Sequence, residues 1–236
     1  MRKVLVKISM LLGLYPLMVK IDTNMRQKRE RKAMNQFGLE TLAQADKAVS
    51  SFGGHLFLVF GTLLGAYREK NFIAHDCDID TGLLASERPD NLPEIMSQFG
   101  FSCKRQIYVK ETGRIVEEQY EYKNVGIDIF FYFEDGRCGD DMIYTYISYP
   151  HETKEWREAN KTDGFPSIVK PSSKSVFVRS DFRGHQLYMP VEAENWLRYW
   201  YGDSFMIPNP QWSLSDHKKR SYPSGERLYR RFPSEK

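Results

Sequence analysis

The hydrophobic pattern of the first quarter of the chain predicts a long helix and then a buried strand. Residues 23–51 contain no proline, are rich in helix-forming side chains, and carry an apolar stripe that includes Leu39, Leu42 and Val49. A glycine pair at 53–54 ends this helix. Residues 55–60 are almost continuously apolar, which is typical of a strand covered on both faces. We therefore expect a central strand at this point.

The middle of the chain is divided into strand-length pieces separated by turn residues. After a break at Gly61 and Thr62, elements are expected at 63–68 (helix), from Asp78 (strand), at 85–99 (helix), at 102–109, 115–122, 125–133 and 142–148 (strands) and at 191–201 (helix). Beyond Tyr149, prolines punctuate short pieces and the signals weaken. The pattern predicts an α+β fold in which a mixed β-sheet is flanked by helices.

The N-terminus carries a separate apolar segment. Residues 8–19 form an apolar run of twelve behind three cations, which is too short to span the roughly 30 Å of bilayer hydrocarbon. We expect an N-terminal amphipathic helix within 1–22 that contacts a membrane peripherally, with packing onto the protein's own core as the alternative. The predicted organisation is this helix, a single domain over 23–215 and a basic tail over 216–236.

Composition and charge narrow the class of partner and the compartment. The 236 residues carry 34 Lys and Arg against 31 Asp and Glu, so the net charge of +3 gives no overall field for nucleic acid. The three cysteines are widely spaced and form no Cys-x-x-Cys pair. We expect no nucleic-acid partner, a reducing cytoplasmic location at the inner face of the membrane, and oxygen ligands for any metal.

Three aspartates provide the first candidate chemistry. Asp76, Asp78 and Asp80 are spaced two residues apart, so in an extended conformation their carboxylates project to one face. Like charges on one strand face repel, and a structure that keeps three of them usually supplies a cation. This triplet alone is also common on solvated surfaces, so it predicts a metal site only together with further residues.

A fourth aspartate and a glycine strengthen the prediction. Asp128 lies inside an apolar run, where a charge is costly unless it has a partner. If its strand neighbours Asp78 and Asp80, the three carboxylates suit Mg²⁺ or Mn²⁺. Gly61 and Thr62, at the end of a buried strand and the start of a helix, are suited to approach the phosphates of a ligand. The alternative for Asp128 is an edge-strand residue facing solvent.

These segments together resemble the signature of the LicD and fukutin-related family of the nucleotidyltransferase superfamily. The similar stretches are 61–68, 71–73, 76–80 and 125–130, with weaker likeness at 188–190 and 201–203. The resemblance implies a nucleotidyltransferase-like fold over 23–215, catalytic metal carboxylates at Asp78, Asp80 and Asp128, and donor-phosphate binding by Gly61, Thr62 and Arg68. Asp76 matches an accessory acidic position. Ala74, His75 and Cys77 depart from the usual pattern, which leaves acceptor contacts open.

The same resemblance implies a function. A LicD-type phosphotransferase uses Mg²⁺ or Mn²⁺ to move phosphocholine or a polyol phosphate from a CDP-activated donor to a hydroxyl of a glycan or glycolipid. The expected products are a phosphodiester and CMP, and the expected setting is lipopolysaccharide or capsule biosynthesis.

Three alternatives stay open at the level of sequence. Asp78 and Asp80 also form the Asp-x-Asp motif of metal-dependent glycosyltransferases that use nucleotide sugars. Counting from Asp76 to Glu87 reproduces part of the ligand spacing of an EF-hand calcium loop, but the sixth position is Thr81 where glycine is required. The third alternative is a non-catalytic protein that binds nucleotide or glycan.

Overall fold

The computed structural model describes residues 15–148, 164–209 and 221–233. The helices are α2 (Tyr15–Ser50), α3 (Phe60–Arg68), α4 (Leu92–Gln98) and α6 (Ala193–Tyr201), with a 3₁₀ turn at Ala85–Glu87. The strands are β1 (Phe57–Leu58), β2 (Asp78–Leu84), β3 (Ser102–Val109), β4 (Ile115–Tyr122), β5 (Val125–Tyr132), β6 (Met142–Ser148), β7 (Phe165–Ser173), β8 (Phe177–Phe182), β9 (His185–Pro190) and β10 (Tyr222–Arg231). The predicted α+β class is confirmed.

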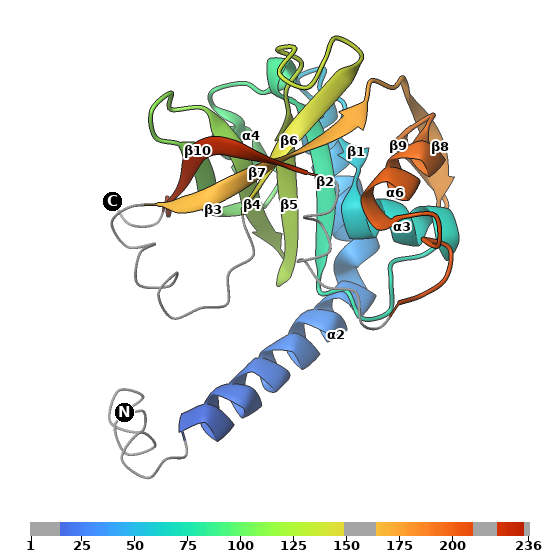
Figure 1. Ribbon diagram of the computed structural model, residues 1–236. Coiled ribbons are helices and arrows are strands. Elements are labelled where there is room, and N and C mark those ends of the chain that lie inside the picture. The colour runs from blue at the N-terminus through green and yellow to red at the C-terminus, as the bar shows by residue number, and fades with distance from the viewer. Residues whose placement is uncertain (1–14, 149–163, 210–220, 234–236) are drawn as a thin grey trace.

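One mixed sheet contains all ten of these strands, in the order β6-β7-β10-β3-β4-β5-β2-β1-β9-β8. Its pairs are antiparallel except for β2 with β5 and β1 with β9, which are parallel. An antiparallel bridge between Phe133 and Tyr144 joins the end of β5 to β6, so the sheet curls back on itself. Figure 1 shows β6 and β7 crossing in front of β4 and β5 as a result.

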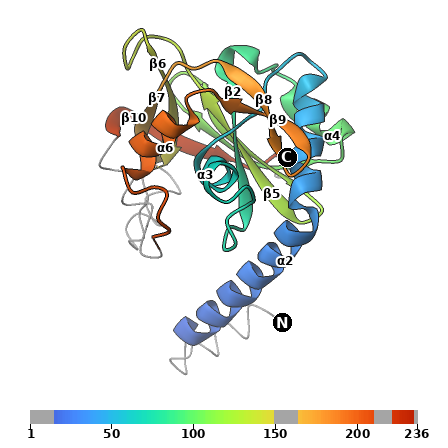
Figure 2. The same ribbon diagram turned by 90° about the vertical axis from the view of Figure 1, so that its right-hand side faces the viewer.

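Helices cover both faces of this sheet. The C-terminal half of α2 and α4 pack on one face, and α3 and α6 pack on the other, as Figure 2 shows. On the α3 side, Phe57 stacks on Phe177 with ring centroids 4.0 Å apart. Trp196 stacks on Tyr132 and donates its indole N–H to the Ser173 carbonyl at 3.0 Å. This aromatic packing anchors α6 to the sheet beside α3.

The long helix differs from its prediction. It is continuous across residue 22, and its buried stripe, which includes Leu42, Ala45 and Val49, begins only at Met34. Toward its N-terminus, α2 extends away from the sheet with most side chains exposed, among them apolar and cationic residues (Figure 1). The predicted amphipathic character is not confirmed. Residues 1–14, which carry much of the predicted membrane segment, lie outside the described residues.

No helix within the described ranges is long and apolar enough to cross a membrane. The predicted helix at 85–99 is split because Arg88 precedes a proline and adopts extended backbone (φ −73°, ψ 117°), as the residue before proline usually does. The basic tail expected over 216–236 is also different, since Tyr222–Arg231 pairs as β10 between β7 and β3. Its charged residues occupy strand positions that alternate between two faces.

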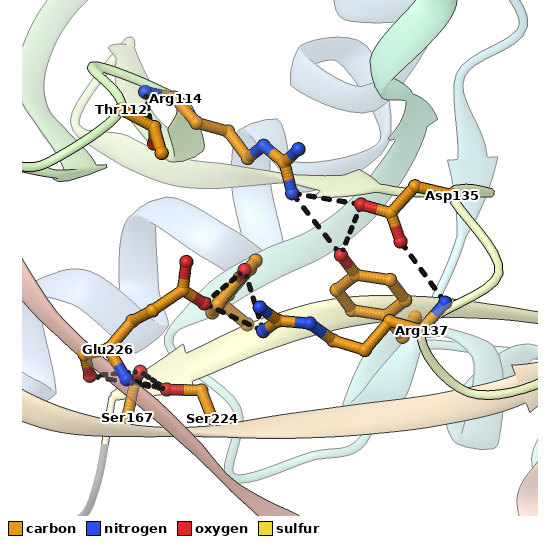
Figure 3. Close-up of polar contacts among 9 residues, drawn as sticks. Thr112, Arg114, Asp135, Arg137, Ser167, Ser224 and Glu226 are labelled. Carbon is orange, nitrogen blue, oxygen red and sulfur yellow. Dashed lines mark hydrogen bonds and ion pairs between the residues drawn. The ribbon is translucent and has the colours of Figure 1, made fainter.

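A polar cluster, which we call the clasp, spans the curl of the sheet (Figure 3). It consists of Arg114, Asp135, Arg137, Tyr144, Tyr146 and Glu226. Asp135 accepts from the Tyr144 hydroxyl at 2.8 Å and pairs with Arg114 at 3.1 Å. Glu226 accepts from the Tyr146 hydroxyl and from Arg137, each at 2.6 Å. The clasp therefore ties the β3–β4 turn, the β5–β6 loop, β6 and β10 together.

Candidate active site

The acidic site consists of Asp76, Asp78, Asp80 and Asp128, and strand register brings its members together. β2 and β5 are parallel neighbours in which Asp80 is the Cα partner of Asp128, and Asp78 is the partner of Gly126. Paired residues of adjacent strands project to the same face, so the carboxylates of Asp78, Asp80 and Asp128 share one face. The predicted adjacency of the two acidic strands is thus present in the structure.

The opposite face of these strands explains why this register is fixed. Ile79, Ile127 and Ile129 are fully buried, so a slip by one residue would expose them and bury the aspartates on the wrong side. Thr81 also stabilises this register by donating a hydrogen bond from its hydroxyl to the Asp128 carbonyl at 2.8 Å. The apolar alternation of β2 and β5 therefore positions the carboxylates.

The start of α3 holds Asp80. The helix begins at Phe60, three residues before the predicted start, with Val59 as its N-cap and the Leu63 N–H bonded to the Val59 carbonyl at 2.9 Å. Gly61 therefore lies in the first turn, where its N–H donates to Asp80 Oδ2 at 3.1 Å. The positive end of the helix dipole favours this carboxylate. The Asp80 N–H in turn donates to Thr62 Oγ1 at 2.8 Å.

Glycine at position 61 has a steric reason. A Cβ added there would lie 3.0 Å from Asp76 Oδ2 and 3.3 Å from Asp80 Oδ2, which is tighter than most real Cβ contacts. Position 61 is thus the point at which the backbone approaches two carboxylates. This close approach is the structural basis of the Gly61 signal in the sequence.

Arg68, the third group predicted to bind donor phosphate, also has described partners. Its Nε and Nη2 donate to Glu69 Oε1 at 3.2 and 2.7 Å, and Nη1 donates to the Phe205 carbonyl at 3.1 Å. In the described contacts, Gly61 and Thr62 position Asp80, and Arg68 ties α3 to the segment after α6. Phosphate binding by these three residues stays a prediction.

Burial and mutual repulsion raise the pKa values of the acidic site. Burial, followed by the charges of Asp78, Asp128 and Asp76, raises the pKa of Asp80 well above its ordinary value. The pKa of Asp128 is also raised well above its ordinary value, by burial first and then by Glu117 and Asp78. Burial and Asp78 raise the pKa of Asp76 to about 6, and burial and Glu30 raise that of Asp78. The charge of Arg105 lowers the pKa values of Asp78 and Asp128 and so offsets part of this repulsion, but the pKa of each of the four carboxyls is still raised.

The donor set fits a hard divalent cation in its chemistry. Its described groups are carboxylate oxygens, and Asp128 Oδ1 is buried without a hydrogen-bond partner, in a residue that is only 8% exposed. Within the described ranges, however, no three His, Cys, Asp or Glu side chains converge closely enough to hold a metal ion. The carboxylates share a face, and their use as Mg²⁺ or Mn²⁺ ligands stays a prediction.

A cleft of about 630 Å³ opens beside the acidic site. Its lining comes from α3, the loop before β2 and the segment at the end of α6, and it includes Gly61, Arg68, Ile73, His75, Asp76, Tyr201 and Phe205. A cleft of this size accommodates a nucleotide-sized ligand, with aromatic and apolar surface for a base or sugar and the carboxylates at one side. Asp76 is the member of the acidic site that lines it.

Three further charged or polar residues on the same face were not found from sequence: Arg105, Glu117 and Gln119. Gln119 is the Cα partner of Asp128, and its side-chain hydrogen bond favours the ionised form of Asp128, whose pKa burial and neighbouring charges raise. The signal was the period-two pattern of β4, which places Glu117 and Gln119 on one face. Arg230, which also lies on this face, was counted among the cations of the predicted basic tail, so its position on a strand was not expected.

A family model described as "LicD/FKTN/FKRP, nucleotidyltransferase domain" matches residues 53–190. The mouse protein "Ribitol-5-phosphate transferase FKTN" is 23% identical over 187 residues, which cover 79% of this chain and 37% of that protein. "Uncharacterized protein T07A5.1" of Caenorhabditis elegans is 25% identical over 178 residues, covering 72% of this chain and 43% of that protein. The chain thus spans about two fifths of the length of these relatives.

Among solved structures, a crystal structure titled as ANT(2")-Ia in complex with adenylyl-2"-tobramycin is similar to 78% of this chain and 86% of its own. The sequence identity is 14% and the TM-score is 0.39. That likeness is too low for any inference about this chain.

Proposed function

The chain belongs to the LicD/FKTN/FKRP nucleotidyltransferase-domain family, and from this premise we propose that it is a phosphotransferase that modifies a glycan. The transferred group is a phospho-alcohol from a CDP-activated donor, and the acceptor is a glycan or glycolipid hydroxyl. The activity in the name of the mouse relative supports ribitol 5-phosphate as the first polyol phosphate to test. Phosphocholine is the second candidate.

The observation that carries this proposal is the pairing of Asp80 with Asp128 across parallel strands, with the N–H of Gly61 bonded to Asp80. This arrangement lies beside a cleft of nucleotide size, which Gly61 and Asp76 line. A bound Mg²⁺ or Mn²⁺, held by Asp78, Asp80 and Asp128, would supply charge neutralisation for a diphosphate and its displacement. The chain's own groups orient the carboxylates and bind the donor.

In the proposed reaction, the acceptor hydroxyl oxygen forms a bond to the donor phosphorus that carries the alcohol. The bond between this phosphorus and the bridging oxygen of the diphosphate breaks, and CMP leaves with that oxygen. The hydroxyl proton passes to Asp128 or to a neighbouring carboxylate of the acidic site. Positioning and electrostatics provide most of the acceleration in phosphoryl transfer, which suits a site built from fixed carboxylates.

The test is a donor screen with the purified chain. The protein is incubated with Mg²⁺, CDP-ribitol, CDP-glycerol or CDP-choline and a panel of surface glycans, and CMP release and product mass are measured. We expect acceptor-dependent CMP release from one of these donors and a product that gains the phospho-alcohol. Turnover that persists after Asp78→Ala and Asp80→Ala substitution would sink the assignment. A product that gains a sugar without phosphorus would instead favour the glycosyltransferase alternative.

A further inference from the structure

A continuous row of polar residues crosses four adjacent strands on the face of the acidic site. Strand pairing aligns Asp80 of β2 with Asp128 of β5, Asp128 with Gln119 of β4, and Gln119 with Arg105 of β3. Neighbouring strands lie about 4.8 Å apart, so Arg105 stands only two strands from Asp128. The row therefore runs from carboxylates to a guanidinium without crossing to the other face.

A second arginine joins this end of the row. Arg230 of β10 is the Cα partner of Ile107, two residues from Arg105 and on the same face of β3. We call Arg105 and Arg230 the guanidinium pair. Burial lowers the pKa of Arg230, and the like charge of Arg105 lowers it further, which places the two cations within electrostatic reach of each other. Arg230 also lies over the Phe165 ring, 4.9 Å from its centroid.

One buried carboxylate serves both cations. Glu117 is 6% exposed and accepts from Arg105 Nη2 at 2.6 Å, and its charge also acts on Arg230. In the clasp, by contrast, Asp135 pairs with one arginine and Glu226 with another. Glu117 thus holds Arg105 by an ion pair and acts on Arg230 through its charge.

The described contacts of Arg105 leave donors available. Among its described contacts, Nη2 donates to Glu117, the Nε atom is buried without a partner, and the side chain keeps 23% of its surface exposed. Arginine presents donors in a planar fork that matches phosphate oxygens. Two neighbouring cations beside a set of repelling carboxylates suit a ligand that carries both a phosphoryl group and a metal ion.

We propose that the guanidinium pair is a phosphoryl-binding subsite, located at the end of the row opposite Asp80. The ligand class is a phosphate ester, and its identity as the donor diphosphate or as a phosphate on the acceptor rests on the proposed function. Binding of this group would set its negative charge against the two cations of the guanidinium pair. Gln119 separates the two charged ends of the row.

The experiment is calorimetric titration of the full chain with CDP and, separately, with glycerol 3-phosphate, both in the presence of Mg²⁺. Arg230→Gln is the first variant because it leaves the pair between Arg105 and Glu117 intact. We expect its affinity for one of the two probes to fall roughly 10-fold, the loss of one charge-assisted contact. Arg231→Gln is the matched control, since Arg231 is the next residue on β10 and bonds Gln106 on the other face. Its affinity should change less than about 2-fold.

Arg105 needs a paired design, because its removal leaves Glu117 buried without its cation. The double variant Arg105→Gln/Glu117→Gln removes both members, and thermal melting checks that it is folded. Its affinity should fall for the same probe whose affinity falls in Arg230→Gln. Loss for CDP alone assigns the subsite to the donor diphosphate, and loss for glycerol 3-phosphate alone assigns it to a phosphate on the acceptor.

The subsite would be overturned by affinities for both probes that are unchanged in the variants, or by a wild-type chain that binds neither probe. An equal loss in Arg231→Gln would also overturn it, because the effect would then follow net charge and not position. A chain that binds CDP through Arg230 but releases no CMP from any donor would contradict the proposed function and leave the subsite standing. The two proposals therefore fail separately.

Discussion

The clasp and the acidic site lie on the same curled sheet, and their carboxylates have opposite environments. In the clasp, Asp135 and Glu226 each accept hydrogen bonds from an arginine and a tyrosine, and the pKa of each is lowered despite partial burial. In the acidic site, burial and neighbouring carboxylates raise the pKa of Asp80 and Asp128. The clasp is complete within the protein, whereas the acidic site is electrostatically incomplete. Charge that stabilises the fold is thereby separated from charge kept for a ligand.

The largest expected effect comes from removing charge at Asp80. Asp80→Asn should lower CMP release by about 10³-fold, because a metal-bound carboxylate contributes several kcal/mol to transition-state stabilisation. The same change should raise the melting temperature of the metal-free protein by about 3 °C, since it relieves repulsion worth on the order of 1 kcal/mol. Calorimetry and the CMP assay measure the two effects. Loss of both activity and stability in this variant would show that Asp80 stabilises the fold, as the carboxylates of the clasp do.

The next effect concerns the close approach at Gly61. Gly61→Ala should reduce turnover by roughly 10- to 100-fold, because its Cβ displaces the carboxylates of Asp76 and Asp80 and such misplacement is costly. Stability should change little, since alanine is favoured over glycine in a helix. Gly126→Ala is the control: its Cβ would lie 3.8 Å from the Asp78 Cβ, an ordinary contact. Equal activity in the two variants would contradict the steric account.

A smaller effect is expected in the clasp. Tyr146→Phe removes the 2.6 Å hydrogen bond to Glu226 without changing the packed ring. It should destabilise the protein by about 1 kcal/mol, a fall of about 2–4 °C in melting temperature for a chain of this size. CDP affinity should be unchanged. A loss of CDP binding at full stability would show that the clasp and the acidic site are functionally coupled.

The smallest effect is the pH dependence of the clasp. Burial alone would raise the pKa values of Asp135 and Glu226, but hydrogen bonds from Tyr144 and Tyr146, together with arginine contacts, lower them below the ordinary 3.8 and 4.5. A carboxyl with a lowered folded-state pKa binds fewer protons in the folded state than in the unfolded state. Its stabilisation is therefore intact above about pH 5 and is lost as the pH falls through 4 and below.

Urea unfolding between pH 3 and 6 measures this dependence. In Asp135→Asn/Glu226→Gln the decline in stability on acidification should be shallower than in the wild type, because the two linked protons are no longer taken up. Glu111 lies on the β3–β4 turn outside the clasp, so Glu111→Gln serves as the control for loss of an acidic group. An unchanged slope in the double variant would contradict the assigned role of the clasp.

Much of the strand framework was predictable because its signals are local. The ranges of β3, β4 and β6 agree with the sequence pattern, and that of β5 differs by one residue. Hydrophobic alternation and turn glycines determine where these strands begin and end. The acidic residues were also found from spacing and resemblance, and the structure gives their strand register. What sequence reasoning missed depends on pairing between distant segments. β7, β9 and β10 contain prolines, β7 to β10 all lack clean alternation, and pairing between strands makes them strands.

The start of α3 illustrates a second limit of prediction from sequence. Residues 55–60 are almost continuously apolar, which predicts a strand of that length, yet β1 ends at Leu58 and Phe60 begins the helix with φ 43°. The Phe60 ring packs edge-on against Phe130 and lies 4.7 Å from Trp200, so tertiary packing decides the boundary. Sequence places Gly61 near phosphate chemistry, but only the structure reveals that its N–H is bonded to Asp80.

The position of β10 has a consequence for synthesis on the ribosome. This strand is late in the chain but lies between β7 and β3 in the interior of the sheet, where it also carries Arg230. Until residues 222–231 leave the ribosome, β3 and β7 each present an unpaired edge able to pair with other chains. The nascent protein must therefore keep two edges protected until translation delivers the strand that joins them.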